Sequence, residues 1–273
     1  MTKITTISSS KPTSIIGLLR ELWLYRDLIW AFSARDLKVK YFQTILGPLW
    51  VIMTPLITVG VMTFVFGIMV RVPSDGLPYL MFYLVAIVPW YAFLTVFNQT
   101  MSSLESQAGL ISKIYFPRLV IAISYAVNGS VDFLVGYAVT VGFAIYFSLL
   151  SWEFLLLMPL LLFIQMAWAL GLGLLLAPYN ARFRDVKHMV PLFVQLYYFA
   201  NPIVYPVSVA PVWAQWLFKI NPFAVVIATY RTLLNGQRTD WMLLAYACLA
   251  SLLILAGGAL LFMRKEKDLV DVL

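Results

Sequence analysis

Charged residues are scarce in this sequence, and their absence from long stretches is its most informative property. Only 11% of the 273 residues are Asp, Glu, Lys or Arg, whereas soluble domains carry about 25%. Cysteine and histidine occur once each, which excludes a disulfide framework within the chain and argues against a metal site. The sequence also lacks the G-x-x-x-x-G-K-[ST] motif, so it predicts no nucleotide-hydrolysing P-loop.

Six stretches contain almost no charge, and each is long enough to cross a membrane. A spanning helix needs about 20 apolar residues for a hydrocarbon core of about 30 Å, and lipid cannot satisfy the backbone of other structures. The stretches are residues 41–70, 76–104, 119–152, 154–181, 189–218 and 241–263, and Asp132 is the one charged residue within them. We therefore predict an all-α integral membrane protein whose 48–263 region holds six spans. They lie at about 48–70, 79–101, 118–149, 154–177, 189–206 and 241–263.

Positive charges are distributed unevenly between the predicted loops, and this bias sets the orientation. Fifteen of the 19 Lys and Arg residues lie before the first span, in the second and fourth connections, or after the last span. The other four are Arg71, Lys219, Arg231 and Arg238. Residues 1–14 have no apolar core of the length that a signal peptide needs. We therefore expect residues 1–47 and 264–273 in the cytoplasm, and the net charge of +7 reflects topology rather than nucleic-acid binding.

The segment before the first span is predicted to be an amphipathic helix on the inner leaflet. Its apolar residues recur at helical spacing, and Trp23 and Trp30 suit headgroup depth; the stripe is Ile15, Leu18, Leu22, Tyr25, Ile29 and Phe32. Ser33 and Asp36 match a capping box that would open a second helical segment. Either a plain topology signal or a docking surface for a cytoplasmic partner explains this basic region.

Residues 102–118 form a second cytoplasmic element, between the second and third spans. Leu104, Ala108, Ile111 and Tyr115 share one helical face, and Pro117 ends the run. A short amphipathic helix at this place suits contact with a soluble protein. A simple interfacial turn is the alternative.

The chain after the fifth span is apolar, aromatic and punctuated by proline. Pro202, Pro206, Pro211 and Pro222 interrupt it, and proline cannot continue a helix without kinking it. Non-helical backbone at membrane depth is tolerated only against protein or a water-filled cavity. We therefore expect short re-entrant helices here that cap a pathway on the outer side.

Several ordered motifs carry a resemblance over nearly the whole chain. They are RDLKVKYFQTILGPLW (35–50), PSDGLPY (73–79), VPW (88–90), LISKIYFPRL (110–119), YYFANPIVYP (197–206) and KINPF (219–223). The sequence resembles the permease subunit of polysaccharide-exporting ABC transporters of the O-antigen, capsule or teichoic-acid kind. The resemblance implies a homodimer in the bacterial cytoplasmic membrane, with two cytoplasmic subunits that hold ATP and Mg. It also implies a dimer channel for a lipid-linked glycan.

The same resemblance implies that residues 102–117 are a coupling helix and that the N-terminal amphipathic helix also touches the ATPase. The coupling candidates are Leu104, Glu105, Ala108, Ile111, Ile114 and Tyr115. Arg35 and Lys38 could meet a lipid pyrophosphate at the cytoplasmic entrance, although binding of ordinary anionic headgroups explains them equally well.

Aromatic residues are the clue to the substrate, because their rings stack on the apolar C–H faces of sugars without a fixed hydrogen-bond pattern. The channel candidates are Trp50, Phe64, Trp90, Phe93, Phe97, Tyr197, Tyr198, Phe199 and Tyr205. Interfacial belts and lipid-facing packing are the competing explanation for each.

Two other kinds of membrane protein could have the same general architecture. One is an ABC permease that exports a small drug or lipid. The other is a membrane-embedded glycosyltransferase, but such an enzyme should show clustered acids, and the acids here are scattered singly. Asp132 is expected to be hydrogen-bonded within the bundle rather than to carry protons, and no catalytic residue or metal ligand is predicted.

Overall fold

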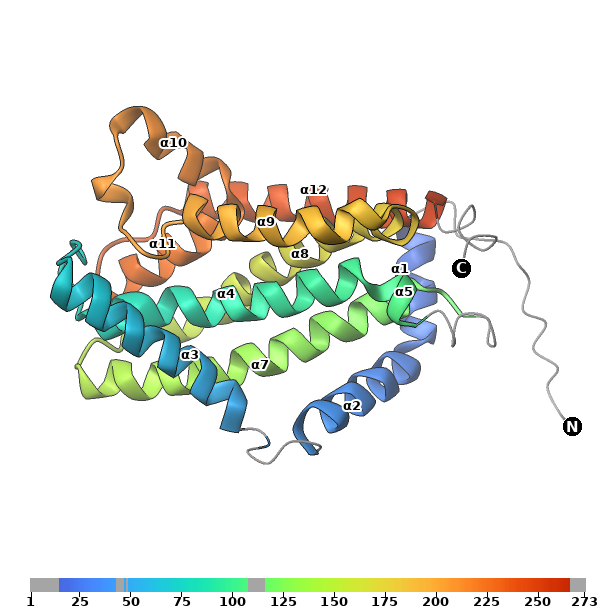
Figure 1. Cartoon of the computed structure of the whole chain (residues 1–273), viewed down its shortest axis with the longest axis horizontal. Helices are drawn as coiled ribbons and strands as arrows, with labels where there is room; N and C mark the ends of the chain where they lie inside the picture. The colour runs from blue at the N-terminus through green and yellow to red at the C-terminus, as the bar shows by residue number, and fades with distance from the viewer. Residues whose placement is uncertain (1–14, 43–46, 48, 108–115, 266–273) are drawn as a thin grey trace, which may run out of the picture.

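The computed structural model describes residues 15–42, 47, 49–107 and 116–265, and within these ranges its regular secondary structure is helical (Figure 1). The helices are α1 (Ile15–Leu24), α2 (Arg26–Phe42), α3 (Leu49–Met62) with the π-helix η1 (Thr63–Met69), α4 (Tyr79–Met101), α5 (Ser103–Ser106), α7 (Leu119–Tyr146), α8 (Trp152–Arg182), α9 (Arg184–Ala200), the 3₁₀ helix η2 (Val207–Val209), α10 (Val212–Ile220), α11 (Pro222–Leu234) and α12 (Trp241–Lys265). The predicted fold class, an all-α membrane protein, is confirmed.

Five segments are long and apolar enough to cross a membrane: α3 with η1, α4, α7, α8 and α12. Helices α10 and α11 together pass the same test, but they meet at 102°, as a broken span or a re-entrant loop would. Helix α9 has 17 residues and lies where the fifth span was predicted. It ends at Ala200 instead of continuing to residue 206, because Asn201 precedes a proline and adopts an extended conformation.

The core of the bundle is built around α4, which lies against α3, α7, α8 and α11. In the most apolar 18-residue stretch of α4, 78% is buried within the chain, and in that of α8, 61% is buried. In the corresponding stretches of α3 with η1 and of α12, only 17% and 22% are buried. Their exposed apolar faces require lipid or another protein as a neighbour.

Helices α8 and α12 approach so closely that two glycines are required where they cross. A Cβ on Gly258 would lie 2.5 Å from the carbonyl oxygen of Gly171, and a Cβ on Gly171 would lie 2.7 Å from the amide nitrogen of Leu255. Backbone atoms cannot rotate away as a side chain can. No pattern in the sequence indicates which glycines meet in this way.

Gly258→Ala should therefore force the two helices apart and lower the free energy of unfolding by about 1–3 kcal/mol. A methyl group on the neighbouring Gly257 would have no atom within 4 Å apart from its own helix backbone, so Gly257→Ala is the matched control. Thermal unfolding of the two purified variants compares them directly. Equal midpoints would contradict this account of the α8–α12 contact.

The two N-terminal helices differ from the prediction in where they break. The capping box at Ser33 is wrong: the chain turns at Tyr25, and α2 runs through Ser33 without interruption. Ser33 is 1% exposed, and its hydroxyl donates to the carbonyl oxygens of Ile29, at 2.9 Å, and Ser124, at 3.3 Å. Ser33 therefore bonds to α7 from the middle of α2 and does not cap the start of a helix.

The N-terminal helices lie at and beside one end of the bundle. Helix α1 crosses this end, and α2 packs along α7 (Figure 1). Phe116, Val120, Ile121 and Tyr125 form a small apolar cluster with the α1–α2 residues Leu22, Tyr25, Leu28, Ile29 and Phe32. Trp23 and Trp30 are 69% and 67% exposed, as residues at a membrane surface would be.

Candidate functional site

The two ends of the bundle carry different elements. One end has α1 and α5, and we call it the α5 end; the other carries α10 and is called the α10 end (Figure 1). At the α5 end, Lys187 of α9 donates to Glu105 of α5 at 2.8 Å, so a salt bridge connects the two elements. Leu104 is 1% exposed and packs into the core, whereas the side chain of Glu105 is 27% exposed.

The other predicted coupling residues, Ala108, Ile111, Ile114 and Tyr115, lie outside the described residues. The coupling role of the whole set stays a prediction. What the described part shows is an ion pair between α5 and α9, formed by Glu105 and Lys187.

Asp132, the intramembrane acid of α7, is held by two residues of α2. Its carboxylate forms an ion pair with Lys40 and accepts a hydrogen bond from the Tyr41 hydroxyl at 2.6 Å. The Asp132 side chain is 11% exposed and that of Lys40 is 41% exposed. Burial and the hydrogen bond to Asp132 raise the pKa of Tyr41 above its ordinary value, which keeps the phenol protonated as a donor.

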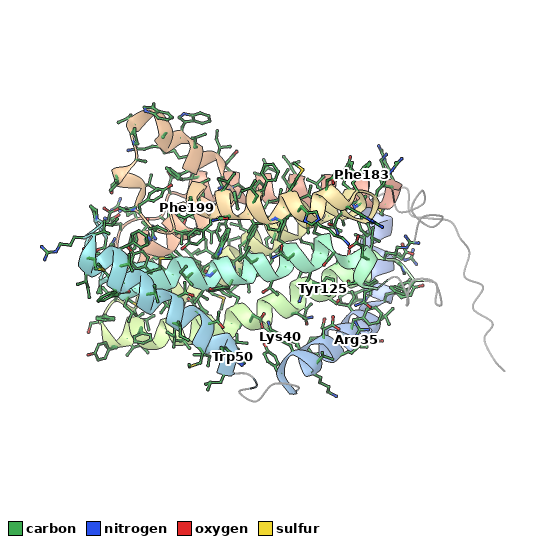
Figure 2. The ribbon with its side chains drawn as sticks, viewed as in Figure 1. Arg35, Lys40, Trp50, Tyr125, Phe183 and Phe199 are labelled. Carbon is green, nitrogen blue, oxygen red and sulfur yellow. The ribbon has the colours of Figure 1, made fainter. Side chains whose placement is uncertain are left out.

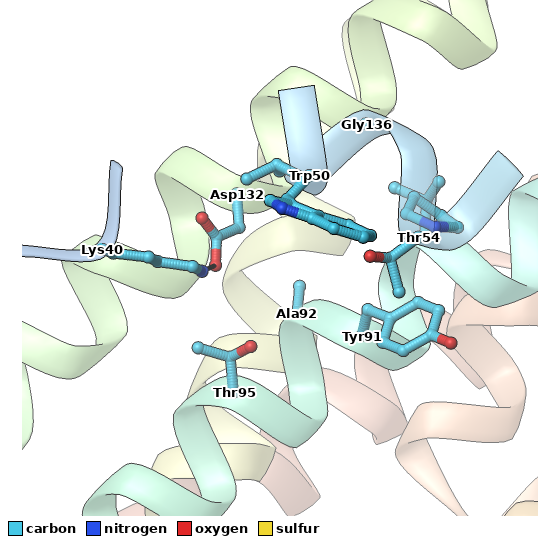
Figure 3. A pocket seen from close by; sticks show the side chains of 11 residues that line it. Lys40, Trp50, Thr54, Tyr91, Ala92, Thr95, Asp132 and Gly136 are labelled. Carbon is cyan, nitrogen blue, oxygen red and sulfur yellow. Dashed lines mark hydrogen bonds and ion pairs between the residues drawn. The ribbon is translucent and has the colours of Figure 1, made fainter. Parts of the chain in front are cut away.

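A cavity of about 200 Å³ lies beside this ion pair (Figure 3). Trp50 and Thr54 of α3, Tyr91 of α4 and Asp132 of α7 line it, and Lys40 reaches in from α2. Residues of four helices therefore meet around one charged pair.

Three of the predicted channel aromatics are interior residues of α4. Trp90, Phe93 and Phe97 are 5%, 1% and 6% exposed. Their rings pack in series, with centroids 5.5 Å apart for Trp90 and Phe93 and 5.7 Å apart for Phe93 and Phe97. In this conformation they contact the chain's own core, so they could reach a substrate only if the bundle opened.

Tyr197 is the centre of a polar network near the α10 end. Its hydroxyl accepts from the indole N–H of Trp168 at 2.9 Å and donates to Asn221 Oδ1 at 2.7 Å. Asn221 Nδ2 donates to Asn201 Oδ1 at 2.9 Å, and Asn221 Oδ1 also accepts from the Phe223 backbone at 3.1 Å as the N-cap of α11. The network fastens the end of α9 to α8 and to the bend between α10 and α11.

Tyr197→Phe should lower the free energy of unfolding by about 1–3 kcal/mol, because Trp168 then loses its acceptor in a buried place. The comparison is Tyr146→Phe, since Tyr146 is 78% exposed at the end of α7. Thermal unfolding of both purified variants measures the difference. A midpoint for Tyr197→Phe as high as that of Tyr146→Phe would show that the network contributes nothing.

The remaining channel candidates lie nearer the surface. Trp50, Phe64 and Phe199 are 48%, 58% and 53% exposed. Tyr198 and Tyr205 are partly buried, and the Tyr205 hydroxyl donates to the carbonyl oxygen of Phe199 at 2.6 Å. The exposed rings of α3, η1 and α9 are therefore the ones available to a second chain, to lipid or to a substrate; Figure 2 labels Trp50 and Phe199 among them.

Arg231 of α11 is a buried residue whose importance the sequence analysis missed. It is 7% exposed, and its guanidinium donates to the carbonyl oxygens of Pro202 at 2.6 Å, Ile203 at 3.0 Å and Phe82 at 3.2 Å. The guanidinium carbon also lies 3.4 Å from the ring centroid of Phe82. A lone arginine in the apolar run FAVVIATYRTLL was the available signal, because such a charge must be satisfied by protein groups.

Of the two residues predicted to meet a pyrophosphate, Arg35 has a partner in its own helix. It forms a salt bridge with Asp36 at 2.7 Å, and its side chain is 44% exposed. Lys38 is exposed on α2. Within the described residues, no three His, Cys, Asp or Glu side chains gather as a metal site.

Comparisons with known proteins agree over most of the chain. The sequence profile of the family described as ABC-2 type transporter matches residues 27–235. The O-antigen export system permease protein RfbA of Myxococcus xanthus is 27% identical over 257 residues, which are 93% of this chain and 98% of the relative. A Klebsiella pneumoniae protein of the same name is 26% identical over 250 residues, 90% and 95% of the two chains. The polysialic acid transport protein KpsM of Escherichia coli is 21% identical over 251 residues, 88% and 94%.

Proposed function

The chain belongs to the ABC-2 type transporter family, and from this premise we propose that it is the permease subunit of an ATP-driven polysaccharide exporter. The observation that carries the proposal is the alignment, over 88–93% of this chain, with two O-antigen export permeases and a polysialic acid transport protein. The substrate is a glycan attached to a lipid carrier, and it crosses the bacterial cytoplasmic membrane.

ATP is hydrolysed by a separate subunit, which holds ATP and Mg. The described geometry supports a contact with such a subunit at the α5 end, where α1, α2 and α5 lie together (Figure 1). The excess of Lys and Arg in the segments of this end supports a cytoplasmic location for it, by the positive-inside rule. Both termini are then cytoplasmic, and α10 and α11 lie at the outer surface.

The working unit is a homodimer whose channel lies between the two copies. Two faces support this arrangement, because η1 and α9 present the exposed rings of Phe64 and Phe199 away from the chain's own core. Exposed rings at these positions offer a sliding glycan contacts with its C–H faces. The buried rings of α4 instead pack in the core behind the exposed faces and stabilise them.

The test of this proposal is an ATPase measurement on purified components. The chain alone should hydrolyse no ATP, and the chain purified with the neighbouring ATP-binding subunit should hydrolyse it faster than that subunit alone. A complex whose subunit lacks its P-loop lysine is the matched control. Substantial hydrolysis by the chain alone, or failure of every ATP-binding subunit encoded beside it to associate, would contradict the proposal.

A further inference from the structure

A groove of about 280 Å³ lies at the α10 end of the bundle, where α8 and α12 begin beside each other (Figure 1). The start of α8, the connection between α11 and α12, and the first residue of α12 line it. Trp152, Glu153, Gln237, Arg238 and Trp241 are among the lining residues. The volume lies just below the ~300–1,000 Å³ of small-molecule sites, so the groove suits a compact group.

Two tryptophans indicate the level of this groove in the membrane. Trp152 and Trp241 are the first residues of α8 and α12, which are both long and apolar enough to cross a membrane. They are 71% and 63% exposed. Tryptophan at the end of a span favours headgroup depth, because its ring is apolar and its indole N–H is polar. The groove therefore opens at the level of the lipid headgroups.

The groove holds one charge of each sign, and the two are not paired with each other. Glu153 is half-buried in the first turn of α8, and Arg238 is exposed in the connection before α12. Within the described residues neither side chain makes an ion pair or a hydrogen bond. The nearby Asp240 already accepts from the backbone N–H of Leu243 at 3.1 Å. A carboxylate and a guanidinium are therefore both available to a ligand.

These charges favour a zwitterion over an anion or a neutral sugar. A purely anionic group would meet the like charge of Glu153, and a neutral sugar would leave both charges without a counter-ion. In addition, none of the residues that line the groove belongs to η1 or α9, whose exposed faces the proposed dimer channel uses. A membrane lipid therefore fits this place better than a glycan in transit.

We propose that this groove binds the headgroup of one phosphatidylethanolamine molecule of the adjacent leaflet. The phosphate accepts from the Arg238 guanidinium and the Gln237 amide, and the primary ammonium donates to the Glu153 carboxylate. Only two carbons separate the ammonium from the phosphate ester, so one headgroup can pair with both charges. The acyl chains then lie along the starts of α8 and α12, where Leu156 and Met242 are 65% and 85% exposed.

Native mass spectrometry of the full-length chain with three lipids of identical acyl chains tests the proposal. Phosphatidylethanolamine should bind about fivefold more tightly than phosphatidylcholine, whose ammonium has no N–H for Glu153, and than phosphatidylglycerol, which has no cation. Equal binding of phosphatidylcholine would assign the affinity to the phosphate and the tryptophan rings. Equal binding of phosphatidylglycerol would assign it to Arg238 alone, and either result overturns the proposal.

Two variants locate the bound headgroup, and a third is their matched control. Glu153→Gln should abolish the preference for phosphatidylethanolamine over phosphatidylglycerol, and Arg238→Gln should weaken binding of both lipids by about fivefold. Arg71→Gln should leave binding unchanged, because Arg71 is also an exposed arginine but does not line the groove. If either groove variant binds the lipids as the unchanged chain does, the two-charge site is wrong.

Thermal unfolding separates a binding role from a structural one. In detergent without added lipid, Glu153→Gln and Arg238→Gln should unfold at the same temperature as the unchanged chain, because neither side chain bonds within the described residues. Added phosphatidylethanolamine should raise the midpoint of the unchanged chain but not that of either variant. A lowered midpoint without lipid would assign the residue to the fold and overturn its role as a ligand group. The proposed export function does not depend on this outcome, since no predicted channel residue lines the groove.

Discussion

Arg231→Leu should lower the free energy of unfolding by about 3–5 kcal/mol, the largest loss expected for a single change in this chain. The guanidinium supplies donors to the carbonyl oxygens of Pro202 and Ile203 in the chain break after α9, and to Phe82 of α4. Leucine fills part of the volume but leaves these buried acceptors unpaired. The turn and the two short helices that follow it should then lose their fixed position.

The control is Arg238→Gln, because Arg238 is exposed in the connection before α12. Arg231→Lys should fall between the two, since a single ammonium cannot reproduce the forked donors of arginine. Thermal unfolding and the yield of monodisperse protein measure the relative stability of the three variants. If Arg231→Leu were as stable as Arg238→Gln, Arg231 would not have the structural role assigned to it.

Breaking the Lys40–Asp132 pair should have unequal effects depending on which partner is changed. Lys40→Met leaves the carboxylate of Asp132 largely buried with only Tyr41 as a described partner, and should cost about 2–3 kcal/mol. Asp132→Asn keeps the acceptor for Tyr41 and leaves a lysine that is 41% exposed and can reach water, so it should cost less than about 1 kcal/mol. The double variant Lys40→Met with Asp132→Asn should recover most of the loss, since no charge is left unpaired and Tyr41 keeps its acceptor.

Trypsin cleavage after Arg35 reports the same effect locally, because α2 is protected only while it packs against α7. Cleavage should accelerate in Lys40→Met and stay slow in Asp132→Asn. Lys38→Met is the matched control, since Lys38 lies exposed on the same helix. If Lys40→Met and Lys38→Met are cleaved at the same rate, the ion pair does not hold α2 in place.

Periodicity and composition were sufficient for the architecture, because a membrane span is specified locally by about 20 apolar residues. The four prolines likewise indicated where regular helix would stop after the fifth apolar segment, and α10 and α11 occupy that region. The end of α9 was placed too late because apolar character continues beyond Ala200, whereas the backbone conformation changes at Asn201. Composition indicates whether a segment lies in lipid or in water, but it does not determine the backbone dihedral angles.

The long-range contacts could not be read from the sequence in the same way. Asp132 was expected to bond within the bundle, but its partners lie more than 90 residues earlier, in the segment predicted to follow the amphipathic surface helix. Ser33 matched a helix-start pattern, yet its hydroxyl is used against α7 in mid-helix. Short motifs carry local preferences, and tertiary packing overrode them at both positions.

The most direct test of the proposed function follows the glycan itself in cells that synthesise it. Spheroplasts with and without the chain are probed with an antibody against the glycan, together with a strain whose ATP-binding subunit lacks its P-loop lysine. Glycan should be accessible at the outer surface only when both the chain and an active ATP-binding subunit are present, and it should accumulate inside in the other two strains. Equal surface glycan in the absence of the chain would contradict its assignment as the export permease.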